Sequence, residues 1–167
     1  KTSAGEQASV AQLAWLYRVK QIAKELLVPK YQESAARAAL PRLRALLSAP
    51  EEARHVPRIL QECGIRFVVV EALKSSKIDG VCLWLNEHSP VIGMTMRFDR
   101  MDNFWFVLRH ELEHVLLGHG KVEPSLDVDL NEDVVDEEEK LANAAASEFC
   151  APKARIDSFI KRKAPIF

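Results

Sequence analysis

Residues 104–119, FWFVLRHELEHVLLGH, constrain this chain more than any other stretch. Apolar side chains fill the segment except at four ionisable groups, His110, Glu111, Glu113 and His114. A helix turns about 100° per residue, so His110 and His114 would lie about 40° apart on one face. A helix that is apolar nearly all round is typical of a buried one. Burying imidazoles and carboxylates is costly unless they have partners. The sequence therefore predicts a buried helix whose four ionisable side chains include ligands of a bound ion.

The spacing of that cluster indicates what is bound. His110-Glu111-x-x-His114 puts two imidazoles at positions i and i+4 on a helix, with a carboxylate beside them. Two such histidines bind zinc in many hydrolases, and the glutamate activates the attacking water. The alternative is a pair of satisfied core histidines with solvated carboxylates, which the apolar surroundings disfavour. We therefore predict His110 and His114 as zinc ligands and Glu111 as the catalytic base.

A zinc site of this kind needs a third protein ligand. His119 is one candidate, but it lies one residue beyond the place that the metzincin pattern requires and would point away if the helix continued. The run 136–146, DEEEKLANAAA, predicts a second helix that offers Glu138 and Glu139. Glu139 shares a helical face with Asn143, while Glu138 points more squarely over the alanines. Helical geometry alone leaves both glutamates open.

The two segments together resemble a known family. RHELEHVLLGH followed by EKLANAAASEFCAP is similar to the ImmA/IrrE metallopeptidases, which pair HExxH with a downstream E-x-x-A-N-x-F-A helix. The resemblance covers about residues 56–153, and Ala145 stands where the family pattern has an aromatic residue. It implies that zinc binds to His110, His114 and Glu139, with Asn143 supporting a ligand.

The resemblance also implies a reaction. Glu111 would take a proton from the attacking water and pass it to the leaving amine. A protein substrate would add as an extended strand along a sheet edge, for which we expect residues 91–98. The substrate would be a specific regulatory protein such as a DNA-binding transcriptional repressor. The alternative is a metal-binding sensor or interaction module of a transcriptional regulator or antitoxin, with little or no proteolysis.

The rest of the chain predicts an α+β fold with about three mostly antiparallel strands packed on the HExxH helix and a second ligand-bearing helix. Apolar periodicity predicts N-terminal helices, and β-branched runs predict strands of which the last two are antiparallel. A polar, acidic connection is expected over 119–135. We predict an N-terminal helical extension or linker over 1–50 and a zincin-like domain over 51–167. The helices are expected at 9–27, 31–47, 56–63, 136–149 and 154–163, and the strands at 65–70, 78–85 and 91–98.

Composition bounds the setting of the protein. The chain has 167 residues and a net charge of −1, so nothing calls for direct nucleic-acid binding. No apolar run has the length of a transmembrane helix. Cys63, Cys82 and Cys150 are isolated and are expected to be reduced, as in a cytoplasmic protein. We expect a cytoplasmic protein without a membrane partner, whose apolar N-terminal stripes could also form a homodimer. Because the chain opens on Lys1, a DNA-binding domain could precede it.

Overall fold

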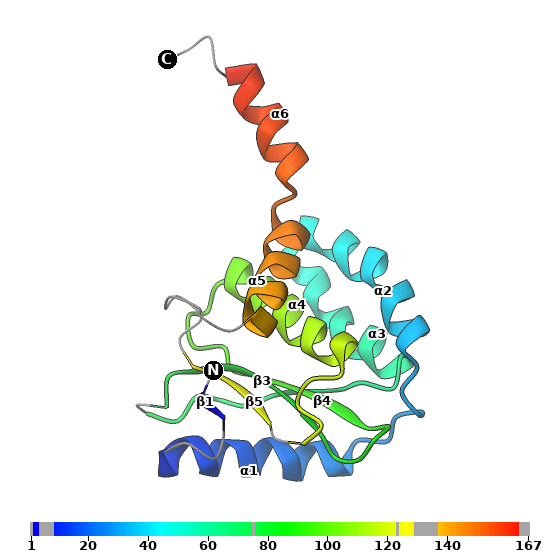
Figure 1. Cartoon of the computed structure of the whole chain (residues 1–167), viewed down its shortest axis with the longest axis vertical. Helices are drawn as coiled ribbons and strands as arrows, with labels where there is room; N and C mark the ends of the chain where they lie inside the picture. Colours follow the sequence, from blue (N-terminus) through cyan, green and yellow to red (C-terminus); the bar gives the residue numbers. More distant parts are fainter. Residues whose placement is uncertain (1, 4–8, 75, 123, 129–136, 164–167) are drawn as a thin grey trace.

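The structure is a computed structural model that describes residues 2–3, 9–74, 76–122, 124–128 and 137–163 (Figure 1). Two short 3₁₀ segments, Leu46–Ser48 and Pro50–His55, connect the second and third helices. The elements in chain order are β1 (Thr2–Ser3), α1 (Val10–Glu25), α2 (Glu33–Ala45), α3 (Val56–Glu62), β2 (Arg66–Val69), β3 (Ile78–Trp84), β4 (Pro90–Met94), α4 (Met101–Leu117), β5 (Ser125–Val128), α5 (Glu137–Cys150) and α6 (Lys153–Lys163).

One mixed sheet organises the fold, with the strand order β1-β5-β3-β4-β2. β3 is antiparallel to both β4 and β5, and Cys82 of β3 stands opposite Ile92 of β4. β2 runs parallel to β4, with Phe67 opposite Ile92. The α+β class predicted from the sequence is confirmed: the sheet packs against the HExxH helix α4, and α5 packs on α4.

Helices cover both faces of the sheet, so the continuous apolar runs of β3 and β4 are buried. α1 lies along one face, and α2 to α5 lie on the other (Figure 1). On the α1 side, Trp15 and Val19 are buried together with Val81 and Val91. The indole nitrogen of Trp15 also donates a hydrogen bond to the carbonyl oxygen of Val70, at 3.2 Å.

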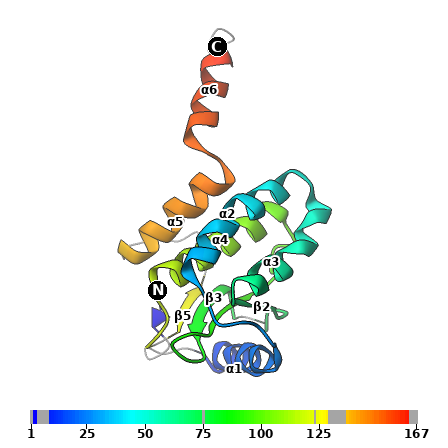
Figure 2. The same ribbon diagram turned by 90° about the vertical axis from the view of Figure 1, so that its right-hand side faces the viewer.

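α4 lies between the sheet and the outer helices, which is why it is apolar nearly all round (Figures 1 and 2). Leu108 and Leu112 of α4 pack in one core with Leu43 of α2 and Ile92 of β4. α5 runs along α4, and its Ala142 and Ala146 are fully buried. Their small side chains allow the two helices to approach closely, which brings ligand candidates on different helices together.

The N-terminal helices belong to these same layers. Buried residues of α1 contribute to the core beneath the sheet, and Ala36, Ala39 and Leu43 of α2 contribute to the core above it. The apolar stripes of both helices are thus used within the chain, while the domain boundary near residue 50 stays a prediction. α6 instead projects away from the body, and its Ile156, Phe159 and Ile160 are exposed (Figures 1 and 2).

Three strands differ from the sequence-based expectation, and the first of them is β1, where no strand was expected. The strand expected over 91–98 ends at Met94. β5 forms inside the stretch 119–135 that was expected to be only a connection, because the pattern Ser-Leu-Asp-Val at 125–128 has the two-residue period of a strand.

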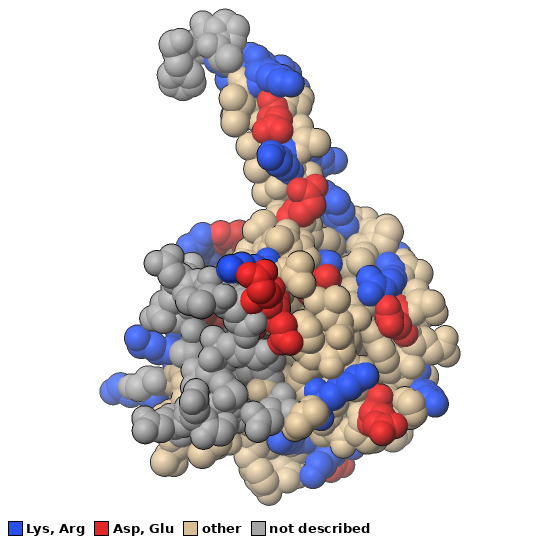
Figure 3. All heavy atoms as spheres, in the orientation of Figure 1, with Lys and Arg blue, Asp and Glu red and all other residues tan. Residues whose placement is uncertain are grey.

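The body surface seen in Figure 3 carries interspersed acidic and basic side chains. Among the described residues, no helix combines the length and apolarity needed to cross a membrane.

Candidate metal centre

α4 carries three of the predicted site residues into the interior. His110, Glu111 and His114 each have no exposed surface in the structure. The helix ends at Leu117, where Gly118 adopts a left-handed φ of 75° and its N–H donates back to the carbonyl oxygens of His114 and Val115. Glycine suits this conformation because it has no Cβ.

α5 supplies a carboxylate to the two imidazoles. His110 Nε2 lies 3.2 Å from Glu139 Oε2, and His114 Nε2 lies 3.4 Å from Glu139 Oε1. The two Nε2 atoms are 3.0 Å apart, and the three potential ligand atoms all lie within 4.8 Å of one another. The structure therefore brings His110, His114 and Glu139 into one buried group that could hold a metal ion.

The outer ring nitrogens fit this role. His110 Nδ1 lies 3.0 Å from Asn143 Oδ1, an amide oxygen that can only accept a hydrogen bond. His110 therefore carries a proton on Nδ1, and its Nε2, which faces Glu139, is the nitrogen that would bind a metal ion. Two imidazoles and one carboxylate form a donor set typical of zinc hydrolases.

The electrostatics of Glu139 agree with this geometry. Its side chain is buried, and burial alone would raise the pKa of the carboxyl group. Hydrogen bonds and charge interactions with His110 and His114 act in the opposite direction and outweigh burial, so the pKa is lowered well below its usual range. Glu139 is thus held as a carboxylate, the form that binds metal ions.

Glu138 and His119, the alternatives for the third ligand, face each other instead. His119 Nε2 lies 3.6 Å from Glu138 Oε1, and the Glu138 side chain is 43% exposed. His119 Nδ1 lies 2.9 Å from His114 Nδ1, the ring nitrogen that does not face Glu139. The chain is fixed there because Trp84 Nε1 donates a hydrogen bond to the His119 carbonyl oxygen, at 2.8 Å. His119 therefore holds the His114 ring through its Nδ1, on the side opposite Glu139.

Glu111 lies against β3, where its side chain occupies the space that a Cβ at Gly80 would fill. A Cβ added at Gly80 would lie 2.0 Å from Glu111 Oε1 and 2.8 Å from its carboxyl carbon. Sequence reasoning did not single out Gly80, although an isolated glycine inside a strand often marks a close approach of other groups. Gly80 thereby leaves room for the proposed base beside the metal ligands.

One further expectation, the site of the substrate strand, can be compared with the structure. β4 lies between β3 and β2, so the expectation that residues 91–98 offer a free sheet edge to a substrate is wrong. The parallel pairing of β2 with β4 occupies that edge. Glu113 lies outside the metal centre and forms an ion pair with Arg109 one turn earlier, at 2.7 Å.

Comparison with known proteins does not assign the chain to a family. No protein-family model matches the chain. A search of curated proteins likewise gave no match.

Proposed function

We propose that this protein is a zinc-dependent endopeptidase. The observation that carries the proposal is the buried group of His110, His114 and Glu139, with Glu111 on the same helix beside it. Zinc is the ion best suited to two imidazoles and a carboxylate, and hydrolytic sites use three protein ligands so that one position stays open. The HExxH pattern and the downstream helix support an ImmA/IrrE-like gluzincin.

A bound zinc ion would supply Lewis acidity towards a peptide carbonyl and towards the attacking water. Glu111 accepts a proton from that water and then donates it to the amine that leaves when the peptide bond breaks. Its burial keeps the proton transfer away from bulk solvent. Asn143 accepts from His110 Nδ1 and thereby fixes the tautomer that presents Nε2 to the metal.

The proposed substrate is a specific regulatory protein, such as a DNA-binding repressor. The sequence resemblance supports this substrate class, since members of the ImmA/IrrE family act in regulatory responses.

Zinc binding and proteolysis can be tested separately. Elemental analysis of the purified chain should find about one zinc per molecule, as expected for a single three-ligand site. The metal should be lost in His110→Ala and in Glu139→Ala.

Proteolysis is tested by incubating the zinc-loaded chain with a cell extract and identifying new protein N-termini. We expect them with the wild type and not with Glu111→Gln, which removes the base while keeping the three ligands. Glu113→Gln is the matched control on the same helix, outside the metal centre. Equal sets of N-termini from the wild type and from Glu111→Gln would refute Glu111-dependent peptidase activity.

The same observations suit a second candidate, a metal-binding sensor or interaction module of a transcriptional regulator. Asn143 contacts His110 and His119 contacts His114, and neither contact involves Glu111. A metal ion could therefore be bound without Glu111 acting as a base. Zinc bound equally well by the wild type and by Glu111→Gln, with no new N-termini from either, would favour this module over the endopeptidase.

A further inference from the structure

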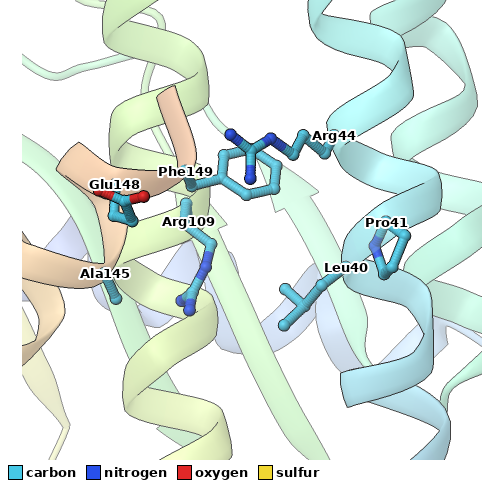
Figure 4. Close-up of a pocket in the computed structure, with 7 residues that line it drawn as sticks. All are labelled: Leu40, Pro41, Arg44, Arg109, Ala145, Glu148 and Phe149. Carbon is cyan, nitrogen blue, oxygen red and sulfur yellow. The ribbon is translucent and has the colours of Figure 1, made fainter. Parts of the chain in front are cut away.

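A pocket of about 390 Å³ opens between α2, α4 and α5, apart from the metal centre (Figure 4). Small-ligand sites typically have volumes of about 300–1,000 Å³, so this pocket has room for a small organic molecule. None of its lining residues is part of the His-His-Glu group. The lining residues are Leu40, Pro41 and Arg44 of α2, Arg109 of α4, and Ala145, Glu148 and Phe149 of α5.

Arg109 is the feature that points to a ligand. Its side chain is only 10% exposed, and its Nη2 lies 2.7 Å from the Glu113 carboxylate. Its Nη1 is buried and has no hydrogen-bond partner among the described residues. A buried charged donor without an acceptor is costly, and such groups in native proteins call for an explanation. Figure 4 shows the Arg109 side chain between α5 and α2, where an acceptor from outside the chain could meet it.

The charges around the pocket favour one negative charge on the ligand. Arg44 provides a second guanidinium group in the pocket lining. The Glu148 carboxylate already accepts a hydrogen bond from the Lys153 N–H at the start of α6, at 3.0 Å. The carboxylates of Glu113 and Glu148 offset part of the attraction that Arg109 and Arg44 exert on an anion. Because this attraction grows in proportion to the ligand's charge, whereas the cost of removing an ion from water grows with the square of its charge, the pocket suits a monoanion better than a dianion such as phosphate.

The remaining walls are apolar, formed by Leu40, Pro41, Ala145 and Phe149. We propose that this pocket binds a small molecule with one carboxylate group and an apolar body. Arg109 Nη1 donates a hydrogen bond to the carboxylate, with Arg44 beside it, and the body packs against Leu40 and Phe149. This site does not depend on the metal or on peptidase activity.

Hexanoate is a suitable probe, with hexanamide as its neutral analogue and inorganic phosphate as an anion without an apolar body. Titrations of the full chain are followed by the amide shifts of the lining residues in NMR spectra. We expect saturable hexanoate binding, with hexanamide at least about tenfold weaker because the charge-assisted hydrogen bond is lost. Equal binding of hexanoate and hexanamide, phosphate binding as tight as hexanoate, or no saturation by hexanoate would each overturn the proposal.

Variants locate the binding. Arg109→Met is combined with Glu113→Gln, so that no half-buried carboxylate is left unpaired, and this pair should weaken hexanoate binding about tenfold or more. Ala145→Leu should also weaken it by filling the pocket. Arg44→Gln changes an exposed residue and should cause a smaller loss. The control is Arg58→Gln, whose side chain is 80% exposed and pairs with Glu62 on α3.

The pattern across these variants decides the proposal. Undiminished hexanoate binding in Ala145→Leu and Arg44→Gln would overturn it, even if the double variant did not fold. An equal loss in Arg58→Gln would also overturn it, because that residue does not line the pocket.

Discussion

His119 Nδ1 lies 2.9 Å from His114 Nδ1, while the Nε2 of His114 faces Glu139. The Nε2 of His119 in turn lies 3.6 Å from the Glu138 carboxylate. With its Nε2 proton directed at Glu138, His119 presents an unprotonated Nδ1 that accepts the Nδ1 proton of His114. This arrangement leaves the Nε2 lone pair of His114 free to bind a metal ion.

Replacement of His119 should therefore weaken zinc binding without abolishing it. His119→Ala removes the acceptor behind His114, and loss of such a supporting partner typically costs about 10- to 100-fold in metal affinity. Competition with a chromophoric chelator measures the affinity. His88→Ala, in an exposed turn, is the control and should bind zinc like the wild type. Unchanged affinity in His119→Ala would show that the contact with His114 does not orient the ring.

The third ligand can be identified by comparing two neighbouring substitutions. Glu139→Gln removes the buried carboxylate that meets both Nε2 atoms, and it should lower zinc affinity more than His119→Ala does. Glu138→Gln removes only the exposed partner of His119, so its effect should not exceed the about 10- to 100-fold loss typical of a supporting residue. The same chelator competition applies. A larger loss in Glu138→Gln than in Glu139→Gln would contradict the assignment.

Tyr31 should make stability depend on pH in the alkaline range. Burial, followed by the charge of Glu33, raises the pKa of its phenol from 10.0 to about 12. The folded state thus favours the neutral phenol, so this stabilisation is complete below pH 10.0 and is lost as the pH rises towards 12. A phenolate absorbance titration should show a late step that is missing in Tyr31→Phe.

Tyr17→Phe is the control for that titration and should keep the late step, because Tyr17 is exposed on α1. In the described part of the chain, the Tyr31 hydroxyl is buried without a hydrogen-bond partner. Tyr31→Phe should therefore leave the free energy of unfolding at neutral pH unchanged or slightly higher, as measured with denaturant. A marked loss of stability would indicate a hydrogen bond to this hydroxyl.

The sequence predicted those parts of the site that depend on spacing within one helix. Helical geometry puts His110 and His114 on one face of α4, and Glu139 and Asn143 on one face of α5. It could not choose between Glu138 and Glu139, because that choice depends on how α5 is rotated against α4. The structure settles the rotation by burying Ala142 and Ala146.

Features that depend on pairing between distant segments were beyond sequence reasoning. The apolar runs predicted β2, β3 and β4, but they carry no information on strand order, so the position of β4 inside the sheet, between β3 and β2, was missed. The close approach of Gly80 to Glu111, and the pocket that Arg109 and Arg44 line from different helices, likewise arise only when separate elements pack. These contacts place the Glu111 carboxylate and shape the pocket, so neither feature could be predicted from the spacing of residues along the chain.

Gly80→Ala should separate catalysis from metal binding. The added Cβ would lie 2.0 Å from Glu111 Oε1, so the carboxylate must move. The three atoms nearest to this Cβ all belong to Glu111, and none belongs to His110 or His114. Zinc affinity should stay close to that of the wild type. Because general base catalysis typically contributes about 10²- to 10⁴-fold, proteolysis should fall by up to that factor.

Gly93→Ala is the matched control for this substitution. Gly93 also lies in the sheet, on β4, and its added Cβ would meet Val19 Cγ1 at 2.7 Å and Val81 Cγ1 at 2.8 Å. The clash is thus of similar kind but lies in the core beneath α1, away from Glu111. Gly93→Ala should lower the melting temperature and keep its turnover at temperatures where it is folded. If both variants lost turnover only in proportion to their stability, Gly80 would serve the fold and not the placement of Glu111.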